Sequence, residues 1–252
     1  MNKSKNHIEL KKDALGQEVL AFFKGEKSFE IIERNDGYIN FSAGALEYFT
    51  EFNEWSEIQK QAIKYAHGRV LDVGAGAGRV SLYLQNKGFD VLAIDNSPLA
   101  IEVCKNRGIK HTKVLPIEHV GKFKTNSFDT IIMLGNNFGL FGNYKKAKNL
   151  LKKFYKITSK DALIIVETVD PYKAEEPIHL AYHEFNRQKG RMAGQLRIRV
   201  RFRNYATDWF DFLFVSKDEM TEILNNTGWK VKKFIGSDND LYPVYSAIIE
   251  KE

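Results

Sequence analysis

Two carboxylates and a run of glycines have the types and spacing of a ligand-binding loop. In RVLDVGAGAGRVSLYL, residues 69–84, Asp72 stands two positions before Gly74, and further glycines follow at Gly76 and Gly78. Glycines let the chain turn tightly after a strand and bring a ligand close to the bare N–H groups of the next helix. A carboxylate at the end of a buried strand is costly without a partner. Because Asp72 would repel a phosphate, it favours a ligand with an ammonium or sulfonium charge.

A second carboxylate, Asp95, ends the next apolar run, 21 residues after Gly74. This is the place for a carboxylate that accepts hydrogen bonds from a ribose diol. In the alternative interpretation, Asp95 only caps the helix that begins at Pro98, a role that Asn96 or Ser97 could also fill. The third glycine of a dinucleotide fingerprint would fall at position 79, where the chain has arginine. The pattern therefore favours an adenosine-type ligand over NAD or FAD.

An alternation of strands and helices is needed to bring these groups together, and residues 69–170 have that pattern. Apolar strand patterns occupy residues 69–74, 89–97, 113–117, 127–135 and 161–170, and helical patterns occupy 78–88, 98–108 and 144–158. This order predicts an α/β fold with a mostly parallel sheet and helices on both faces. Ligands of such sheets bind at the carboxyl ends of the strands.

The flanking regions have different patterns. Residues 1–67 are aromatic-rich and mainly helical, with one short extended piece at 28–39 that is broken at Asp36-Gly37. Residues 171–194 are polar, and strand patterns follow at 195–205 and 208–216, then a helix at 217–228 and strands at 229–236 and 242–252. Consecutive strands predict antiparallel pairing at the far edge of the sheet.

Three segments in this order resemble the class I S-adenosylmethionine-dependent methyltransferases: VLDVGAGAGRVSLYL, VLAIDNSP and SFDTIIMLGNNF. The resemblance spans about residues 69–169, with a compatible ending in WKVKKFIG and YSAIIEKE. We expect a doubly wound, mostly parallel, seven-stranded Rossmann-like sheet with an N-terminal helical segment and a strand-rich insertion near the C-terminal end. The predicted single domain, 1–252, comprises a helical lid (1–67), a cofactor-binding core (68–170), a substrate-side insertion (171–205) and the end of the sheet (206–252).

The resemblance implies a set of cofactor contacts. Asp72 would hold the amino group of S-adenosylmethionine, Gly74, Gly76 and Gly78 would pass beneath its methionine part, Asp95 would bind both ribose hydroxyls, and Asn96 would lie beside the adenine. Leu134 begins the loop LGNNFGLFG, where cofactor and acceptor would meet. Many relatives carry an acidic residue after the third strand, but this chain has Pro116 at about that place, so Glu118 or the Ile117 backbone would contact the adenine.

Three residues are candidates for the transfer step: Asn137, His183 and Tyr38. Asn137, next to Asn136, could orient a hydroxyl or an amine, or it could only bind the loop's own backbone. His183 and His179 would share a helix face, as a base, as substrate contacts or in a structural role, and two histidines alone do not predict a metal site. The loop lacks the prolines of the N-P-P-Y/F signature, which argues against a DNA adenine methyltransferase.

Charge leaves a second type of acceptor open. The formal net charge is +6 and the pI about 9.1, which suits anionic partners such as nucleic acid. Arg197, Arg199, Arg201 and Arg203 alternate with apolar residues, so they are either a solvated sheet face or a grip on an anionic substrate. Trp209 and Phe210 could help to line the acceptor pocket.

We therefore predict an enzyme that transfers a methyl group from S-adenosylmethionine to a small-molecule acceptor by in-line displacement. The alternatives are an RNA or protein methyltransferase, a module that binds the cofactor and transfers nothing and, least favoured, a dinucleotide oxidoreductase. The acceptor atom and the oligomeric state stay open. A single cysteine, Cys104, excludes an internal disulfide, and neither a signal-peptide core nor an apolar run of about 18 residues is found, so a cytoplasmic protein without membrane contact is expected.

Overall fold

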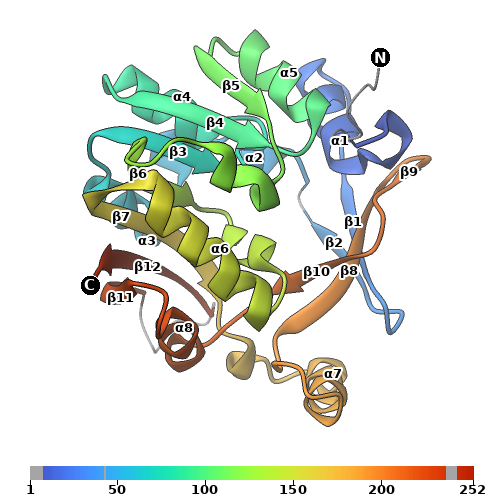
Figure 1. Cartoon of the computed structure of the whole chain (residues 1–252). Coiled ribbons are helices and arrows are strands. Elements are labelled where there is room, and N and C mark those ends of the chain that lie inside the picture. Colours follow the sequence, from blue (N-terminus) through green and yellow to red (C-terminus); the bar gives the residue numbers. More distant parts are fainter. Residues whose placement is uncertain (1–7, 43, 237–242) are drawn as a thin grey trace, which may run out of the picture.

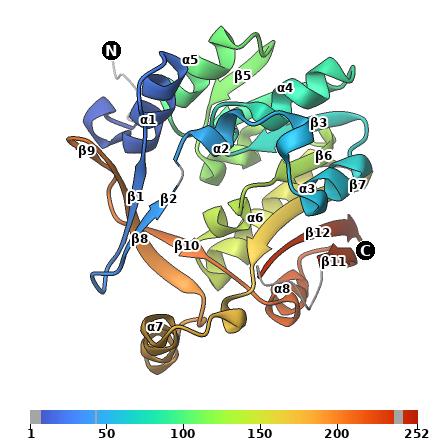
Figure 2. The same cartoon turned by 180° about the vertical axis from the view of Figure 1, so that it is seen from behind.

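The described part of the chain, residues 8–42, 44–236 and 243–252 of this computed structural model, forms two sheets (Figure 1). The larger sheet has seven strands in the order β11-β12-β7-β6-β3-β4-β5. The smaller sheet has the order β10-β8-β1-β2, and β9 pairs with β8. Both views place the smaller sheet to one side of the larger, with α7 beyond it (Figures 1 and 2).

The larger sheet confirms the predicted Rossmann-like α/β architecture. Its strands are β3 (Arg69–Val73), β4 (Asp90–Asp95), β5 (His111–Val114), β6 (Phe128–Met133), β7 (Thr158–Val169), β11 (Trp229–Ile235) and β12 (Val244–Lys251). Five of these strands, from β7 through β6, β3 and β4 to β5, pair in parallel, whereas β12 is antiparallel to both β7 and β11. The carboxyl ends of β3 and β4, where Asp72 and Asp95 lie, therefore meet at one edge of the sheet.

Helices bury the two faces of this sheet. The helices are α1 (Ala14–Phe23), α2 (Leu46–Phe49), α3 (Glu57–Ala62), α4 (Arg79–Asn86), α5 (Pro98–Asn106), α6 (Tyr144–Ile157), α7 (Pro177–Gln188) and α8 (Lys217–Leu224). Short 3-10 turns are η1 (Leu10–Lys12), η2 (Phe52–Glu54), η3 (Ile63–Tyr65), η4 (Ile117–Lys122), η5 (Asn137–Phe141) and η6 (Pro171–Lys173). Side chains of α6 and α8 join one core cluster, and those of α3 and α4 join the cluster on the opposite face. Among the described residues, no helix combines the length and apolar character that a membrane crossing requires.

Local signals in the sequence account for where several helices begin. Ser97 precedes α5, and its Oγ accepts a hydrogen bond from the N–H of Ala100 at 2.9 Å, while Pro98 takes the first turn. A capping box begins α8, with Ser216 and Glu219 each accepting the other's backbone N–H. These caps set the starting points of the helices independently of tertiary contacts.

The smaller sheet corrects two predictions about the flanking regions. The N-terminal region is not only helical, because its extended piece is a hairpin of β1 (Glu30–Arg34) and β2 (Ile39–Ser42). The strands β8 (Gln195–Phe202), β9 (Tyr205–Ala206) and β10 (Phe210–Leu213) do not extend the far edge of the main sheet; β8 pairs antiparallel with β1 instead. Both predicted lid segments thus build one sheet. Predicted lid residues 1–7, and Tyr242 of the last predicted strand, lie outside the described residues.

The two faces of β8 have different surroundings, as its alternation predicts. On one face, Arg199 donates two hydrogen bonds to Glu33, at 2.8 and 3.0 Å, and the guanidinium of Arg201 lies 3.6 Å from the same carboxylate. The other two arginines of this alternating series pair with carboxylates as well: Arg197 with Asp211 and Arg203 with Glu26. On the other face, the apolar side chains are buried or half-buried. The arginines are therefore paired with carboxylates, and only Arg197 of the four also lines the cavity between the two sheets.

Candidate active site between the two sheets

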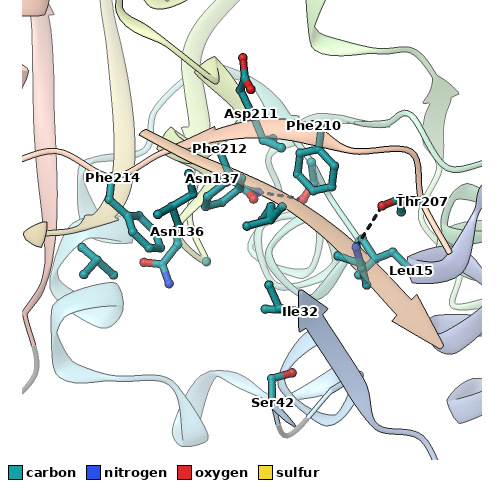
Figure 3. Close-up of a pocket in the computed structure, with 18 of the residues that line it drawn as sticks. Leu15, Ile32, Ser42, Asn136, Asn137, Thr207, Phe210, Asp211, Phe212 and Phe214 are labelled. Atoms are coloured by element: carbon teal, nitrogen blue, oxygen red, sulfur yellow. Dashed lines mark hydrogen bonds between the residues drawn. The ribbon is translucent and has the colours of Figure 1, made fainter. Parts of the chain in front are cut away.

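A cavity of about 1320 Å³ lies between the strand tips of the larger sheet and the inner face of the smaller one. Its walls include Asp72, the loop at residues 73–76 and Asp95 from the larger sheet. Glu30, Ile32 and Arg34 of β1, Ile198 and Val200 of β8, and Phe210 and Phe212 of β10 come from the smaller sheet. Figure 3 shows part of this wall, including the loop that carries Asn136 and Asn137. The two sheets therefore form a single site.

The three glycines of the loop have two different roles. All three adopt positive φ, at +74° for Gly74, +56° for Gly76 and +80° for Gly78, which disfavours side chains. Gly74 and Gly76 line the cavity, and a Cβ on Gly76 would find nothing nearer than Tyr48, at 3.8 Å. Gly78 is not part of the cavity wall, and a Cβ there would overlap the side chain of Ile109. The predicted ligand contact of Gly78 is replaced by a packing role.

Asp95 organises the loop from the tip of the neighbouring strand. It is 6% exposed, and its carboxylate accepts hydrogen bonds from the N–H of Gly76 at 2.9 Å and from the N–H of Ser97 at 2.9 Å. Burial raises the pKa of Asp95 to about 6, although these two hydrogen bonds oppose the rise. A carboxylate oxygen has two lone pairs, so both oxygens retain acceptor capacity toward the cavity.

Asp72 is the second buried carboxylate at this edge. It is 4% exposed, and its Oδ2 accepts a hydrogen bond of 2.6 Å from the hydroxyl of Ser81. Burial raises the pKa of Asp72 to about 6, and the negative charge of Asp95 adds to the rise, while the hydrogen bond from Ser81 opposes it. Two carboxylates with raised pKa values therefore lie beside one cavity. A positively charged ligand there would stabilise their ionised forms.

The predicted adenine-side residues also border the cavity. Ile117 and Leu134 are buried and Asn96 is exposed, and all three line the wall. Glu118 lines it too, but its carboxylate lies 3.4 Å from the Nζ of Lys146, and both side chains are about half exposed. The positive charge of Lys146 therefore partly compensates the negative charge of Glu118.

Asn137 ties two loops together. Its Nδ2 donates to the backbone oxygens of Val73, at 3.0 Å, and of Gly74, at 2.9 Å. The side chain therefore binds the backbone of the glycine loop, and its amide nitrogen is occupied. Its neighbour Asn136 has a buried Oδ1 without a hydrogen-bond partner in the described part of the chain, while its backbone N–H donates to Glu167 at 3.1 Å. An unpartnered buried acceptor is costly, so a ligand N–H would satisfy it.

The other two candidates for the transfer step lie around α7. Arg34 donates from its Nη1 to the Nδ1 of His179 at 3.0 Å, and the ring of Tyr38 meets that histidine edge-on, with centroids 4.8 Å apart. His183 is 6% exposed, and burial lowers its pKa, with further lowering from Arg187, His179 and Arg34. His183 is therefore neutral at pH 7. Within the part of the chain that the structure describes, no three His, Cys, Asp or Glu side chains gather closely enough to hold a metal ion.

Comparison with known proteins shows what the core of the chain is similar to. Residues 71–166 match the family model described as a methyltransferase domain. The fold matches a crystal structure of a SAM-dependent methyltransferase from Bacteroides fragilis in complex with S-adenosyl-L-homocysteine, with a TM-score of 0.82 and 24% identity over 98% of this chain and 99% of that one. The core at residues 71–166 is therefore similar to a methyltransferase domain, and the fold of the chain is similar to that of a SAM-dependent methyltransferase.

Curated relatives match the chain over shorter spans. A glycine/sarcosine N-methyltransferase of Aphanothece halophytica is 26% identical over 157 residues, which cover 57% of this chain and 59% of the relative. The enzyme of the same name from Halorhodospira halochloris is 30% identical over 104 residues, 39% of either chain. The chain thus spans less than two thirds of the length of these relatives.

Sequence patterns missed a second polar network of this candidate site. Gln59 in α3 donates from its Nε2 to Glu167 at the end of β7, at 2.8 Å, and accepts from the Nη2 of Arg79 at 3.0 Å. Arg79 occupies the position of the third dinucleotide glycine, and its guanidinium lies 4.8 Å from the ring centroid of Trp55. Only the arginine was visible in the sequence as a departure from a motif, because Gln59 and Glu167 belong to no local pattern.

Asp13 is another residue of the candidate site that sequence patterns missed. It accepts the N–H of Gly16 at 3.0 Å as the N-cap of α1, and it accepts the hydroxyl of Ser97 at 2.8 Å. The contact joins the first helix of the lid to the turn after β4, beside Asp95. In the sequence, Asp13 is recognisable only as a possible N-cap of the helix that follows it. A capping pattern does not specify which residue of the core the side chain contacts.

The affinity of the cavity for S-adenosylmethionine is expected to depend on pH. Because both aspartates titrate near 6 and a cationic ligand favours their ionised forms, affinity for S-adenosylmethionine should fall as the pH drops from about 7.5 to about 5. The stability of the ligand-free protein depends on pH in the opposite direction. The pKa of an aspartate is near 3.8 in the unfolded chain and about 6 for each of these two in the folded protein, so the free energy of unfolding decreases as the pH rises from 4 to 6. Calorimetry across this range tests the first effect, and a flatter profile in Asp72→Asn is expected. An unchanged slope in that variant would assign the dependence to other groups.

Proposed function

We propose that the chain binds S-adenosylmethionine and transfers its methyl group to a nitrogen of a small-molecule acceptor. The observation that carries this proposal is the pair of buried carboxylates, Asp72 and Asp95, at the tips of adjacent parallel strands beside a glycine loop open to one cavity. The family model over residues 71–166 supports it.

The residues of the cavity suit that cofactor. Asp95 would accept hydrogen bonds from the ribose hydroxyls, and Asp72 would face the amino group, while the bare backbone at Gly74 and Gly76 allows close approach. Ile117 and Leu134 provide apolar surface for the adenine. The bound sulfonium would supply an electrophilic methyl group, and the protein would supply alignment and exclusion of water.

The cavity has room for a second ligand. Pockets for one small molecule usually have about 300–1,000 Å³, and this one has about 1320 Å³. The additional space lies against the smaller sheet, which encloses it opposite the glycine loop. A cavity of this size between the two sheets supports a small molecule as acceptor more than a folded protein or an RNA helix.

The charge of the wall supports an amine as the acceptor. Twelve carboxylates but only six lysines and arginines line the cavity, whereas the whole chain has a net charge of +6. The arginine ladder of β8, which raised the possibility of an anionic partner, is paired with Glu33, Asp211 and Glu26. An acidic cavity attracts cationic ligands and repels a nucleic acid backbone. The curated relatives are named as N-methyltransferases, which supports nitrogen as the accepting atom.

We assign a different role to each of the three candidates for the transfer step. Asn137 is a positioning residue, because its amide holds the glycine loop. The unpartnered Oδ1 of Asn136 would accept an N–H of the acceptor amine and so orient its lone pair. An amine must be neutral to accept a methyl group, and the neutral imidazole of His183, on the same cavity wall, would take up the proton. Tyr38 packs against His179 and would hold it in place.

The proposal is tested in two steps. Calorimetry should show binding of S-adenosylmethionine and S-adenosylhomocysteine but not of NADH. Incubation with a methyl-labelled cofactor and a cell metabolite extract, and separately with glycine and sarcosine, should then label a small amine, detected by mass spectrometry. Binding without any labelled product would favour a cofactor-binding module, and labelled RNA or protein would overturn the small-molecule assignment.

A further inference from the structure

Three phenylalanines along β10 expose their rings to the cavity. Phe210, Phe212 and Phe214 alternate with Leu213 and Val215, which are both fully buried in the core beneath the strand. The phenyl rings are half-buried and line the cavity, so they are on the opposite face of the strand from the core (Figure 3). Partly exposed phenylalanines in a row are not explained by packing within the chain alone.

The rings form an ordered ladder. Phe210 and Phe212 have centroids 6.4 Å apart at 76°, and Phe212 and Phe214 are 5.5 Å apart at 89°, both edge-to-face arrangements. All three rings line the cavity, so another flat or apolar group there would contact them. The ladder, defined as these three residues, is thus a preformed apolar surface.

The ladder lies next to the loop that borders the glycine turn. A Cβ on Gly139 would overlap the ring of Phe212, so the absence of a side chain at position 139 allows the ring to reach this place. Gly139 belongs to the same short turn, η5, as Asn137, whose side chain binds the backbone of Gly74. The ladder therefore begins close to the strand tips where the cofactor is proposed to bind.

The facing strands complete the apolar surface. Ile32 of β1 pairs with Val200 of β8, and Ile198 pairs with Phe210 of β10, so these side chains lie on the same face of the smaller sheet. All four line the cavity, and Figure 3 shows Ile32 and Leu15 bordering the same space as the phenyl rings. A hydrophobic wall of this extent exceeds what an amino acid as small as glycine can cover.

We infer that the acceptor amine carries an apolar, aromatic-sized body that packs on the phenylalanine ladder, with its nitrogen toward the glycine loop. This inference rests on the proposed function and narrows its substrate class. Burying the rings against an apolar group removes their surface from water, whereas glycine or sarcosine would leave the ladder solvated. A wall with both carboxylates and phenyl rings matches a molecule with a cationic end and an apolar end.

Phenethylamine and ethylamine are suitable probes because they differ by one phenyl ring. With the protein loaded with S-adenosylhomocysteine, calorimetry should show phenethylamine binding roughly tenfold or more tightly than ethylamine, glycine or sarcosine, as expected for burial of one ring. With S-adenosylmethionine, mass spectrometry should detect N-methylated phenethylamine. In Phe212→Ala the preference should drop several-fold. Phe41→Ala is the matched control, because Phe41 is 71% exposed on β2 and does not line the cavity.

The outcomes separate the two proposals. If the protein without substitutions does not bind S-adenosylhomocysteine, the proposed function itself is overturned. Normal cofactor binding with equal affinity for the two amines, or an equal loss of preference in Phe41→Ala, would overturn only the substrate class. If Phe212→Ala fails to fold, as judged by its melting temperature and cofactor affinity, Phe210→Ala replaces it, and an unchanged preference in that variant would count against the ladder.

Discussion

Replacing Asp95 with alanine is expected to weaken S-adenosylmethionine binding by about 2 kcal/mol or more, which is roughly thirtyfold. The carboxylate is the acceptor assigned to the ribose hydroxyls, and hydrogen bonds to a charged group contribute more than neutral ones. It also accepts the N–H of Gly76, so its loss loosens the loop that the cofactor approaches. Isothermal titration with S-adenosylhomocysteine and S-adenosylmethionine measures both affinities, and unchanged values would refute the assignment.

Two variants separate ligand binding from scaffold effects at this strand. Asp90→Ala changes an exposed carboxylate at the start of the same strand, β4, and should leave both affinities unchanged. Ser97→Ala keeps the carboxylate of Asp95 but removes the hydroxyl that caps α5 and binds Asp13. It should lower the melting temperature, while cofactor affinity drops less than in Asp95→Ala. Equal losses of affinity in Ser97→Ala and Asp95→Ala would point to a scaffold role alone.

Alanine at Gly78 is expected to destabilise the fold, whereas alanine at Gly76 is expected to weaken cofactor binding. At Gly78 the left-handed backbone costs about 1–2 kcal/mol and the clash with Ile109 about 1–3 kcal/mol more. The free energy of unfolding should fall by about 2–5 kcal/mol, which lowers the melting temperature by roughly 4–20 °C. Thermal and denaturant unfolding measure this change.

Gly76→Ala is the paired variant because a Cβ there meets only open cavity and Tyr48 at 3.8 Å. Its strain is limited to the positive φ, about 1–2 kcal/mol, but its methyl group would occupy space that the proposed cofactor needs. Affinity for S-adenosylhomocysteine should fall at least roughly tenfold, for a loss of about 1.4 kcal/mol. The opposite pattern, with Gly78→Ala deficient in binding and stable, would restore the ligand role of Gly78 that the motif implied.

Most of the core could be predicted from sequence patterns that span only a few residues. Periodicity identified strands and helices from β3 to β7, and α4, α5 and α6 each connect two neighbouring parallel strands. The same patterns located Asp72 and Asp95 at strand ends, and parallel strands bring their carboxyl ends to one edge without further information. Caps such as Ser97 and Ser216 were recognisable because their hydrogen bonds close within three or four residues.

The roles of individual loop residues could not be predicted in this way. Gly76 and Gly78 look alike in a motif, yet one faces the cavity and the other packs on Ile109, which follows α5. Asn137 was expected either to orient an acceptor or to bind its own loop, and it binds the neighbouring loop instead. These outcomes depend on which loops are brought together, and spacing within one loop does not contain that information.

The sequence by itself determined the α/β core and the carboxylates at its edge, because local hydrogen bonding and burial periods encode those features. Only the tertiary structure decided that the N-terminal hairpin and the strands after α7 form one sheet. Ile32 and Val200 are far apart in the sequence, and antiparallel strands at that separation meet through complementary faces rather than through a turn. The part of the cavity that the phenylalanine ladder lines exists only once that long-range pairing is made.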